Sequence, residues 1–220
     1  KAGAFTSPHL LRYHERIRLD GADATDAELI DAFEAIDAAR GQTTLTFFEY
    51  NALAAMWLFR QRRMDFAVLE VGLGGRLDAV NIVDAEAAIV CSIGLDHADW
   101  LGTDVEQIGR EKAGVFRAGS LAVVADPAMT PSVAAEADRI GARQLRAGSH
   151  YTWQVDAAGG RWSFRGAQRF DDLDPPALAG ELQYANAAAA LATLSGMGVD
   201  LKPQAINHAL RSLRLPGRFQ

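Results

Sequence analysis

A glycine-rich loop after an apolar run constrains this chain more than any other feature. The run ends at Glu70, and the sequence Val-Gly-Leu-Gly-Gly-Arg-Leu-Asp-Ala-Val-Asn continues to Asn81. A carboxylate at the end of a buried parallel strand lies where α/β proteins hold ligands. Glycines let the backbone approach a ligand closely, and a carboxylate beside phosphates commonly holds Mg²⁺. The stretch therefore predicts chemistry on phosphates with a metal ion.

The composition excludes several classes of protein. Of the 220 residues, 49% are hydrophobic, which supports a substantial core, and the net charge of −6 leaves no basic surface for nucleic acid. No apolar run reaches the length of a transmembrane helix, so no membrane partner is expected. A single cysteine, Cys91, rules out an intrachain disulfide and suits a reducing compartment. We therefore expect a cytoplasmic protein, and we expect it to be a monomer.

The predicted elements alternate between strands and helices. Strands are expected at residues 3–6, 66–71, 88–93 and 121–125. Helices are expected after caps at Asp26 and Asp104 and at residues 46–62, 132–139, 181–197 and 203–213. A less regular stretch is expected from Gln144, and residues 151–170 alternate like hairpins. This order predicts an α/β fold, a doubly wound and mostly parallel sheet with a small β-hairpin annex.

Several polar residues outside the loop are candidates for chemistry, although each also fits an ordinary structural role. Ser7 follows the first strand and is either a ligand of Mg²⁺ or phosphate, or a turn residue before proline. His97 lies between two aspartates after a buried strand and is either a functional group or a packed side chain. Lys112, early in a helix, is either functional or a solvated charge. Phe48 and Trp100 fit the core or a pocket wall.

The glycine loop matches neither common nucleotide-binding pattern. Leu77 stands where the third glycine of the dinucleotide fingerprint belongs, and no Walker A pattern occurs in the 220 residues. Taken alone, the loop is also consistent with a tight turn between a strand and a helix. The signals become specific only when several blocks are considered in order.

Six blocks in order carry a resemblance to a known family. They are Thr-Ser-Pro-His-Leu at 6–10, Thr-Phe-Phe-Glu at 46–49, Glu-Val-Gly-Leu-Gly-Gly-Arg-Leu-Asp at 70–78, Leu-Asp-His-Ala-Asp-Trp-Leu-Gly at 95–102, Gly-Arg-Glu-Lys-Ala-Gly at 109–114 and Leu-Pro-Gly-Arg-Phe-Gln at 215–220. Together they strongly resemble the folylpolyglutamate synthase and dihydrofolate synthase family of the Mur ligase superfamily, and its bifunctional bacterial members most. The resemblance spans essentially the whole chain. It implies the Mur ligase central domain, a P-loop-NTPase-like ATPase fold.

The resemblance implies a ligase that uses ATP to join L-glutamate to dihydropteroate or to a folate such as tetrahydrofolate, through an acyl phosphate. Metals and oriented donors best neutralise the charge that such a reaction develops. By resemblance, Ser7 and Glu70 hold Mg²⁺ on the nucleotide phosphates, and His97 with Glu70 holds a second Mg²⁺. Lys112 corresponds to the lysine that is carbamoylated in this superfamily. Lys112 and His97 are accordingly the expected catalytic residues.

The same resemblance implies a pocket for the pterin ring and a nucleotide site. Phe48 is expected to stack on the ring, and Thr46 or Asp78 to hydrogen-bond its edge. The expected pocket residues are Thr46, Phe48, Gly74, Asp78 and Ala79. The expected nucleotide contacts are Gln183, Asn186 and Arg218.

The chain departs from the family pattern in two expected missing segments and at two residue positions. The P-loop is expected before residue 1 and the glutamate-binding domain after residue 220. Residues 1–220 are therefore expected to form most of the central ATP-binding domain and to be inactive alone. Asn51 stands where a small residue is common and Val80 where threonine is common, which is expected to tune the pocket.

Three other readings stay open. A peptidoglycan-precursor ligase belongs to the same superfamily, but the blocks at 46–49 and 70–78 favour folate. A metal-dependent hydrolase could use Glu70, His97 and Asp99 around an activated water. A non-catalytic remnant could keep the fold, although the presence of Glu70, His97 and Lys112 weighs against it.

Overall fold

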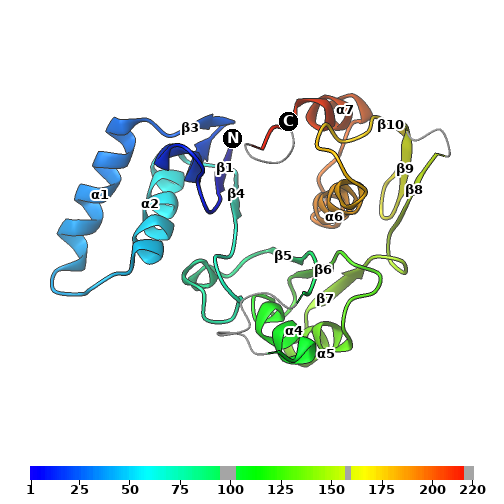
Figure 1. Cartoon of the computed structure of the whole chain (residues 1–220), viewed down its shortest axis with the longest axis horizontal. Helices are drawn as coiled ribbons and strands as arrows, with labels where there is room; N and C mark the ends of the chain where they lie inside the picture. Colours follow the sequence, from blue (N-terminus) through cyan, green and yellow to red (C-terminus); the bar gives the residue numbers. More distant parts are fainter. Residues whose placement is uncertain (95–102, 157–159, 216–220) are drawn as a thin grey trace. The chain divides into compact units, whose positions relative to one another are not determined.

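The computed structural model divides into two units, Lys1–Val83 and Asp84–Gln220 (Figure 1). It describes residues 1–94, 103–156 and 160–215. Each unit has its own hydrophobic core and is described by itself. None of the helices in the described part of the chain has both the length and the apolar character that crossing a bilayer requires.

The first unit is a small mixed sheet with two helices. Its elements are β1 (Ala2–Phe5), the 3-10 helix η1 (Tyr13–Arg16), β2 (Ile17–Leu19), β3 (Ala22–Asp23), α1 (Asp26–Arg40), α2 (Phe47–Arg62), β4 (Phe66–Leu69) and the 3-10 helix η2 (Ala79–Ile82). The strand order is β3-β2-β1-β4, in which β1 and β4 are parallel and the other pairs are antiparallel. Helices α1 and α2 lie side by side (Figure 1). The short antiparallel strands β2 and β3 are absent from the sequence-based prediction.

Both helices of the first unit begin with a capping box. At α1 the hydroxyl of Thr25 accepts the N–H of Glu28, and the carboxylate of Glu28 accepts the N–H of Thr25. Thr46 and Glu49 make the same exchange at α2. Each exchange satisfies two backbone donors that a helix start leaves unpaired. The prediction that Asp26 caps the first helix is wrong by one residue, because Thr25 supplies the cap and Asp26 is already helical.

The strand that leads to the glycine loop is more exposed than its sequence predicts. Phe66 is 43% exposed and Val68 is 61% exposed, although the continuous apolar run indicates a strand buried on both faces. Phe66 and Val68 share one face of β4 and do not belong to the core of this unit, whereas Leu69 on the other face packs against that core. The core of this unit lies instead around Phe5, Ile17 and Leu58.

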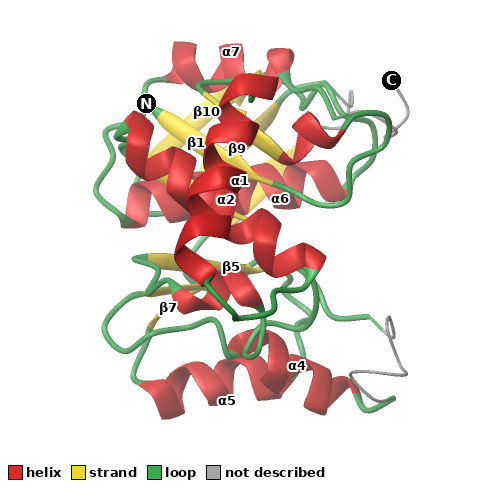
Figure 2. Cartoon of the chain, turned by 90° about the vertical axis from the view of Figure 1, so that its left-hand side faces the viewer, coloured by secondary structure: helices red, strands yellow, loops and turns green. Residues whose placement is uncertain are grey.

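The second unit carries a parallel sheet and an antiparallel one. Its elements are β5 (Ala87–Val90), α4 (Val105–Ala113), β6 (Leu121–Val124), α5 (Pro131–Ile140), β7 (Arg143–Arg146), β8 (Thr152–Val155), β9 (Trp162–Arg165), β10 (Arg169–Leu173), α6 (Leu182–Gly196) and α7 (Pro203–Ser212). The order β5-β6-β7 is parallel throughout, and β10-β9-β8 is antiparallel throughout. Helices α4 and α5 lie side by side (Figure 2).

The parallel sheet of the second unit is covered on both faces. Ala122 and Val124 of β6 belong to a core with Val133 of α5, whereas Val123 belongs to a core with Leu191 of α6. Successive residues of a strand point to opposite faces, so α5 and α6 cover opposite sides. This arrangement confirms the predicted α/β class with a doubly wound sheet.

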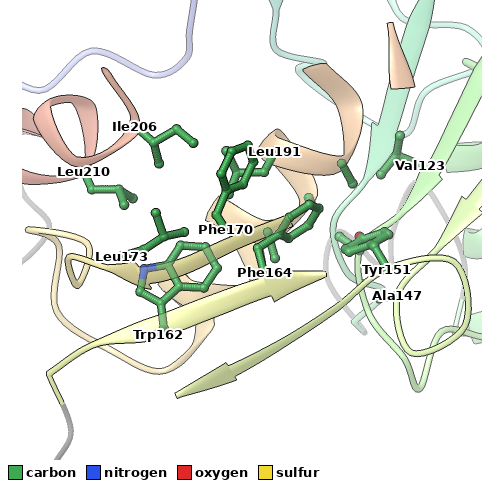
Figure 3. Close-up of a cluster of buried hydrophobic side chains, with 14 residues drawn as sticks. Val123, Ala147, Tyr151, Trp162, Phe164, Phe170, Leu173, Leu191, Ile206 and Leu210 are labelled. Atoms are coloured by element: carbon green, nitrogen blue, oxygen red, sulfur yellow. The ribbon is translucent and has the colours of Figure 1, made fainter. Parts of the chain in front are cut away.

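The antiparallel strands confirm the predicted hairpin annex. Their buried side chains form one cluster with α6 and α7 (Figure 3). The prediction of an irregular stretch from Gln144 is wrong, because Arg143–Arg146 is β7, the third parallel strand. The polar sequence Arg-Gln-Leu-Arg hides this strand, since its place at the edge of the sheet needs little apolar surface.

Candidate functional site

The parallel pairing of β1 and β4 brings two predicted site residues together. Phe5 pairs with Leu69, and the N–H of Glu70 donates to the carbonyl of Phe5 at 2.9 Å. Ser7 lies two residues beyond β1 and Glu70 one residue beyond β4, and the backbone N–H of Ser7 donates to Oε2 of Glu70 at 2.7 Å. Within the described residues, Oε1 of Glu70 has no hydrogen-bond partner, so this oxygen is available to a cation. The contact places the two residues side by side through the backbone of Ser7, and their role as metal ligands stays a prediction.

The carboxylate of Asp78 organises the glycine loop. Its Oδ2 accepts the N–H groups of Gly72 and Leu73, each at 3.0 Å, and its Oδ1 accepts the N–H of Val80 at 3.0 Å. Gly74 has a φ of 70°, a left-handed conformation that favours glycine. Asp78 therefore has a structural role, with one lone pair left for the predicted contact to a ligand.

Replacing Asp78 with alanine is expected to loosen the loop. Three backbone N–H groups lose their acceptor, which is expected to lower the free energy of unfolding of the first unit by about 1–3 kcal/mol. Hydrogen exchange at Gly72, Leu73 and Val80 should become at least about tenfold faster. The exposed Asp31→Ala on α1 is the matched control and should leave these amides unchanged. Equal protection in Asp78→Ala and wild type would contradict the role.

The two predicted pocket residues at the start of α2 make structural contacts. Phe48 packs against its neighbours, and Thr46 caps the helix. The rings of Phe48 and Phe5 are 5.7 Å apart, and a Cβ on Gly72 would come within 2.6 Å of the Phe48 ring. Gly72 therefore lets the loop approach the helix closely. The hydroxyl of Thr46 donates to Oε2 of Glu49 at 2.8 Å as part of the capping box. Phe48 thus packs against the glycine loop, and its stacking on a ligand stays a prediction.

A cavity of about 380 Å³ lies between α2 and the end of the loop. It is lined by Leu53, Met56, Leu77, Asp78, Ala79 and Asn81, among others. Two of the predicted pocket residues, Asp78 and Ala79, line it. Thr46, Phe48 and Gly74 are not among its lining residues. An apolar wall with a few polar groups is typical of a site for a small molecule.

The loop after Ser7 is held by a residue that the sequence analysis missed. The carboxylate of Glu15 accepts the N–H groups of Leu10, Leu11 and Arg12 at 2.8, 3.0 and 2.7 Å. The N–H groups of Leu10 and Arg12 hold the pKa of Glu15 below its ordinary value. The three-residue spacing from Arg12 to Glu15, the spacing of a capping box, is the signal that could have found it.

Acid is expected to release this loop. The lowered pKa means that the ionised Glu15 stabilises the fold at pH values above its ordinary pKa of 4.5. The stabilisation is lost as the pH falls through the lowered folded-state pKa. Amide resonances of Leu10, Leu11 and Arg12 should therefore titrate together below pH 4.5. The Glu15→Gln variant should abolish this step, and a step of the same size in that variant would contradict the assignment.

In the second unit Lys112 lies in the last turn of α4, not early in the helix as predicted. Asp104 caps the helix as expected, accepting the N–H of Glu106 at 2.9 Å. A Cβ on Gly109 would come within 2.7 Å of Thr130, so this glycine allows α4 and α5 to pack closely. Part of the block at 109–114 is therefore explained by packing, while the half-buried Lys112 is not.

The remaining predicted residues divide into two groups. Gln183 and Asn186 lie in the first turns of α6, where Nδ2 of Asn186 donates to Oε1 of Gln183 at 3.3 Å. His97 and Arg218 lie outside the described residues. Among the described residues, no group of three or more His, Cys, Asp or Glu side chains is arranged to hold a metal. Mg²⁺ commonly takes only one or two carboxylates and keeps several waters, so Glu70 beside Ser7 fits such a site.

Comparison with known proteins shows which enzymes this chain is similar to. A scan against models of protein families gives no match. The chain is 46% identical over 221 residues to the dihydrofolate synthase/folylpolyglutamate synthase of Escherichia coli strain K12, covering 100% of the chain and 51% of that relative. Its fold is similar to E. coli FolC in complex with DHPP and ADP, with a TM-score of 0.93, 46% identity and coverage of 100% and 52% of the two chains.

A further solved structure agrees with this result. It is a bifunctional folylpolyglutamate synthase/dihydrofolate synthase with Mn, AMPPNP and L-glutamate bound, with a TM-score of 0.91 and 45% identity. The alignment covers 100% of this chain and 52% of that one. The chain thus spans about half the length of the curated relatives it matches. In sequence and in fold this chain is similar, over its whole length, to dihydrofolate synthase/folylpolyglutamate synthases.

Proposed function

We propose that the protein containing this chain is an ATP-dependent ligase that joins L-glutamate to dihydropteroate, to the γ-carboxylate of folates, or to both. The observation that carries the proposal is the likeness over the whole chain to enzymes of this name. Ligands of those relatives support it, since one structure holds DHPP with ADP and another holds Mn, AMPPNP and L-glutamate. The chain would supply most of the central ATP-binding domain.

The proposed reaction has two steps. The carboxylate of the acceptor first attacks the γ-phosphorus of ATP, which forms an acyl phosphate and releases ADP. The amine of L-glutamate then attacks the acyl carbon, and the tetrahedral intermediate expels phosphate and leaves an amide. Both steps bring anions together, so most of the catalysis must come from positioning and from neutralising charge.

The proposal assigns a role to several residues of this chain. Glu70 and Ser7 would hold Mg²⁺, which supplies charge neutralisation on the phosphates. His97 would join Glu70 at a second Mg²⁺. Gln183, Asn186 and Arg218 would contact the nucleotide, and the cavity beside Asp78 and Ala79 would receive the pterin, with Thr46, Phe48 and Gly74 at its approach. We further propose that the protein is a monomer and that it lies in the cytoplasm. The single cysteine of this chain suits a reducing compartment.

Product analysis tests the proposal directly. The full-length protein is incubated with ATP, Mg²⁺, L-glutamate and dihydropteroate, and the products are identified by mass spectrometry. A ligase forms the glutamyl amide only when ATP and glutamate are both present. A hydrolase consumes its substrate without either, and that result would overturn the proposal. Turnover of a peptidoglycan precursor in place of dihydropteroate would move the protein to the other ligase class.

We also propose that Lys112 is carbamoylated, and a variant of this residue tests that part of the proposal separately. Lys112→Ala should lower ligase activity, and short carboxylic acids such as acetate should restore part of it, because they replace the lost anionic oxygens. Lys202→Ala, an exposed lysine paired with Asp200, is the control and should keep full activity with or without acetate. Failure of every short acid to restore Lys112→Ala would leave the carbamate without support.

A further inference from the structure

The histidine in the block at 6–10 has a defined partner in the structure. Nδ1 of His9 accepts the Nε–H of Arg16 at 2.7 Å, and the rings of His9 and Tyr13 are 6.0 Å apart. Tyr13 and Arg16 are the first and last residues of η1. His9 lies two residues beyond Ser7, so these contacts join the loop that carries Ser7 to η1.

Arg16 is an unusual residue for its place, because it is buried without a carboxylate. It is 7% exposed, and in the described part of the chain no Asp or Glu side chain forms an ion pair with it. Its guanidinium lies 5.2 Å from the centroid of the Phe47 ring. Burial of a cation without a counter-charge costs free energy, and an apolar side chain of similar length would pack against Phe47 without that cost. The feature that arginine adds here is the N–H that it directs at His9.

The chain on the other side of Ser7 is tied to η1 as well. The N–H of Thr6 donates to the carbonyl of Arg16 at 2.9 Å, and the Thr6 hydroxyl donates to the carbonyl of Glu15 at 3.2 Å. The carboxylate of Glu15 holds the loop only beyond His9. Ser7 therefore lies between two attachments, one at Thr6 and one at His9. The second of these depends on the side chain of Arg16.

We propose that Arg16 and His9 are positioning residues for the metal site. Arg16 fixes His9, and His9 keeps Ser7 in its place, where the Ser7 N–H donates to Oε2 of Glu70. The inference rests on the proposed function, since it takes Ser7 and Glu70 as ligands of Mg²⁺. Neither positioning residue is required to contact the ion. Groups that orient metal ligands raise the affinity for the metal, so loss of the contact between Arg16 and His9 should weaken metal binding.

Calorimetry on the full-length protein tests this role. Binding of AMPPNP, an ATP analogue that is not hydrolysed, is measured with Mn²⁺ and with EDTA, which separates the metal-dependent part of the affinity from the rest. Arg16→Met keeps the length of the side chain, and His9→Ala removes the acceptor. Each should weaken binding with Mn²⁺ by at least about tenfold and leave binding with EDTA within about twofold. A loss of stability alone would not separate the two conditions.

Two further variants are matched controls. His9→Asn places an amide oxygen on Cγ, where the histidine carries Nδ1, and should keep binding with Mn²⁺ within about threefold of wild type. Arg18→Ala removes an exposed arginine of β2 that donates to the carbonyl of Gly21, and it should bind like wild type. Thermal melting checks that the Arg16 variant is folded. His9 is only half-buried, so its variants test the contact even if Arg16→Met does not fold.

Hydrogen exchange gives a readout without metal or nucleotide. The amide of Ser7 should exchange at least about tenfold faster in Arg16→Met and in His9→Ala, because the loop around it is then held at Thr6 alone. The amides of α1 should be unchanged. Equal exchange at Ser7 in wild type and in both variants would overturn the positioning role.

The calorimetric outcomes distinguish this inference from the proposed function. If Mn²⁺ does not tighten AMPPNP binding to the wild-type protein, the metal site is overturned, and the positioning role with it. Metal-dependent binding that both variants leave intact would overturn the positioning role alone. Equal losses in His9→Ala and His9→Asn would also overturn it, because the acceptor would then have no effect.

Discussion

Replacing Glu70 with alanine in the full-length protein is expected to lower the rate of ligation by at least about 100-fold. The carboxylate lies at the joint end of β1 and β4, where one oxygen accepts the N–H of Ser7 and the other is available to a cation. Its loss would remove the charge that we propose holds Mg²⁺ on the phosphates. The measurement is the rate of phosphate release at saturating substrates over a range of Mg²⁺ concentrations.

Two further variants separate the charge of Glu70 from its contact with the backbone. Glu70→Gln keeps an oxygen for the N–H of Ser7 and removes the charge, so its activity should be as low as that of the alanine variant. Glu86→Ala removes an exposed carboxylate of the second unit and should leave the rate unchanged. Activity of Glu70→Ala within about tenfold of wild type would contradict the metal assignment.

Replacing Trp162 with alanine is expected to cost about 3–5 kcal/mol in the free energy of unfolding of the second unit. Trp162 is 2% exposed, packs edge-on against Tyr184 at 5.9 Å and donates its Nε1–H to the carbonyl of Asp174 at 2.8 Å. It lies in the cluster that joins the antiparallel strands to α6 and α7 (Figure 3). Urea denaturation followed by circular dichroism measures the effect.

The Trp162→Phe variant gives the matched comparison. It keeps a buried ring and loses the N–H, so its cost should be smaller, about 1–3 kcal/mol from the unpaired carbonyl and the lost volume. Trp153→Ala removes a tryptophan that is only partly buried against the same cluster and should also cost less. A cost below about 1 kcal/mol for Trp162→Ala would contradict the importance of this cluster.

The elements that the sequence predicted well are those with long, regular patterns. Helix α2 and the strands β5 and β6 have apolar runs whose length identifies them, and Asp104 caps α4 as expected. Strands β2 and β3 have three and two residues, which is too short for any periodicity to show. Their existence depends on the antiparallel return of the chain onto β1, which is a tertiary effect.

Composition alone could not predict how exposed β4 is. An apolar run indicates what a strand can bury, but the neighbouring elements determine what it does bury. Phe66 and Val68 lie outside the core of the first unit, so their exposure follows from what packs on their face of the strand and not from their residue types.

The candidate site also has features that could be predicted from the sequence and features that could not. The meeting of Ser7 and Glu70 was expected from the family resemblance, and the parallel pairing of β1 with β4 is what brings the two residues together. The roles of Asp78 and Glu15 were not, because each carboxylate collects N–H groups that only the folded loop brings together.

The measurement that tests the central claim most directly is phosphate release by the full-length protein with ATP, Mg²⁺ and L-glutamate, with dihydropteroate or tetrahydrofolate as acceptor. The proposed function predicts glutamate-dependent release with at least one of the two acceptors. Release with both identifies a bifunctional synthase, and release with tetrahydrofolate alone restricts the protein to polyglutamylation. No glutamate-dependent release with either acceptor would contradict the assignment of this protein as a folate-directed ligase.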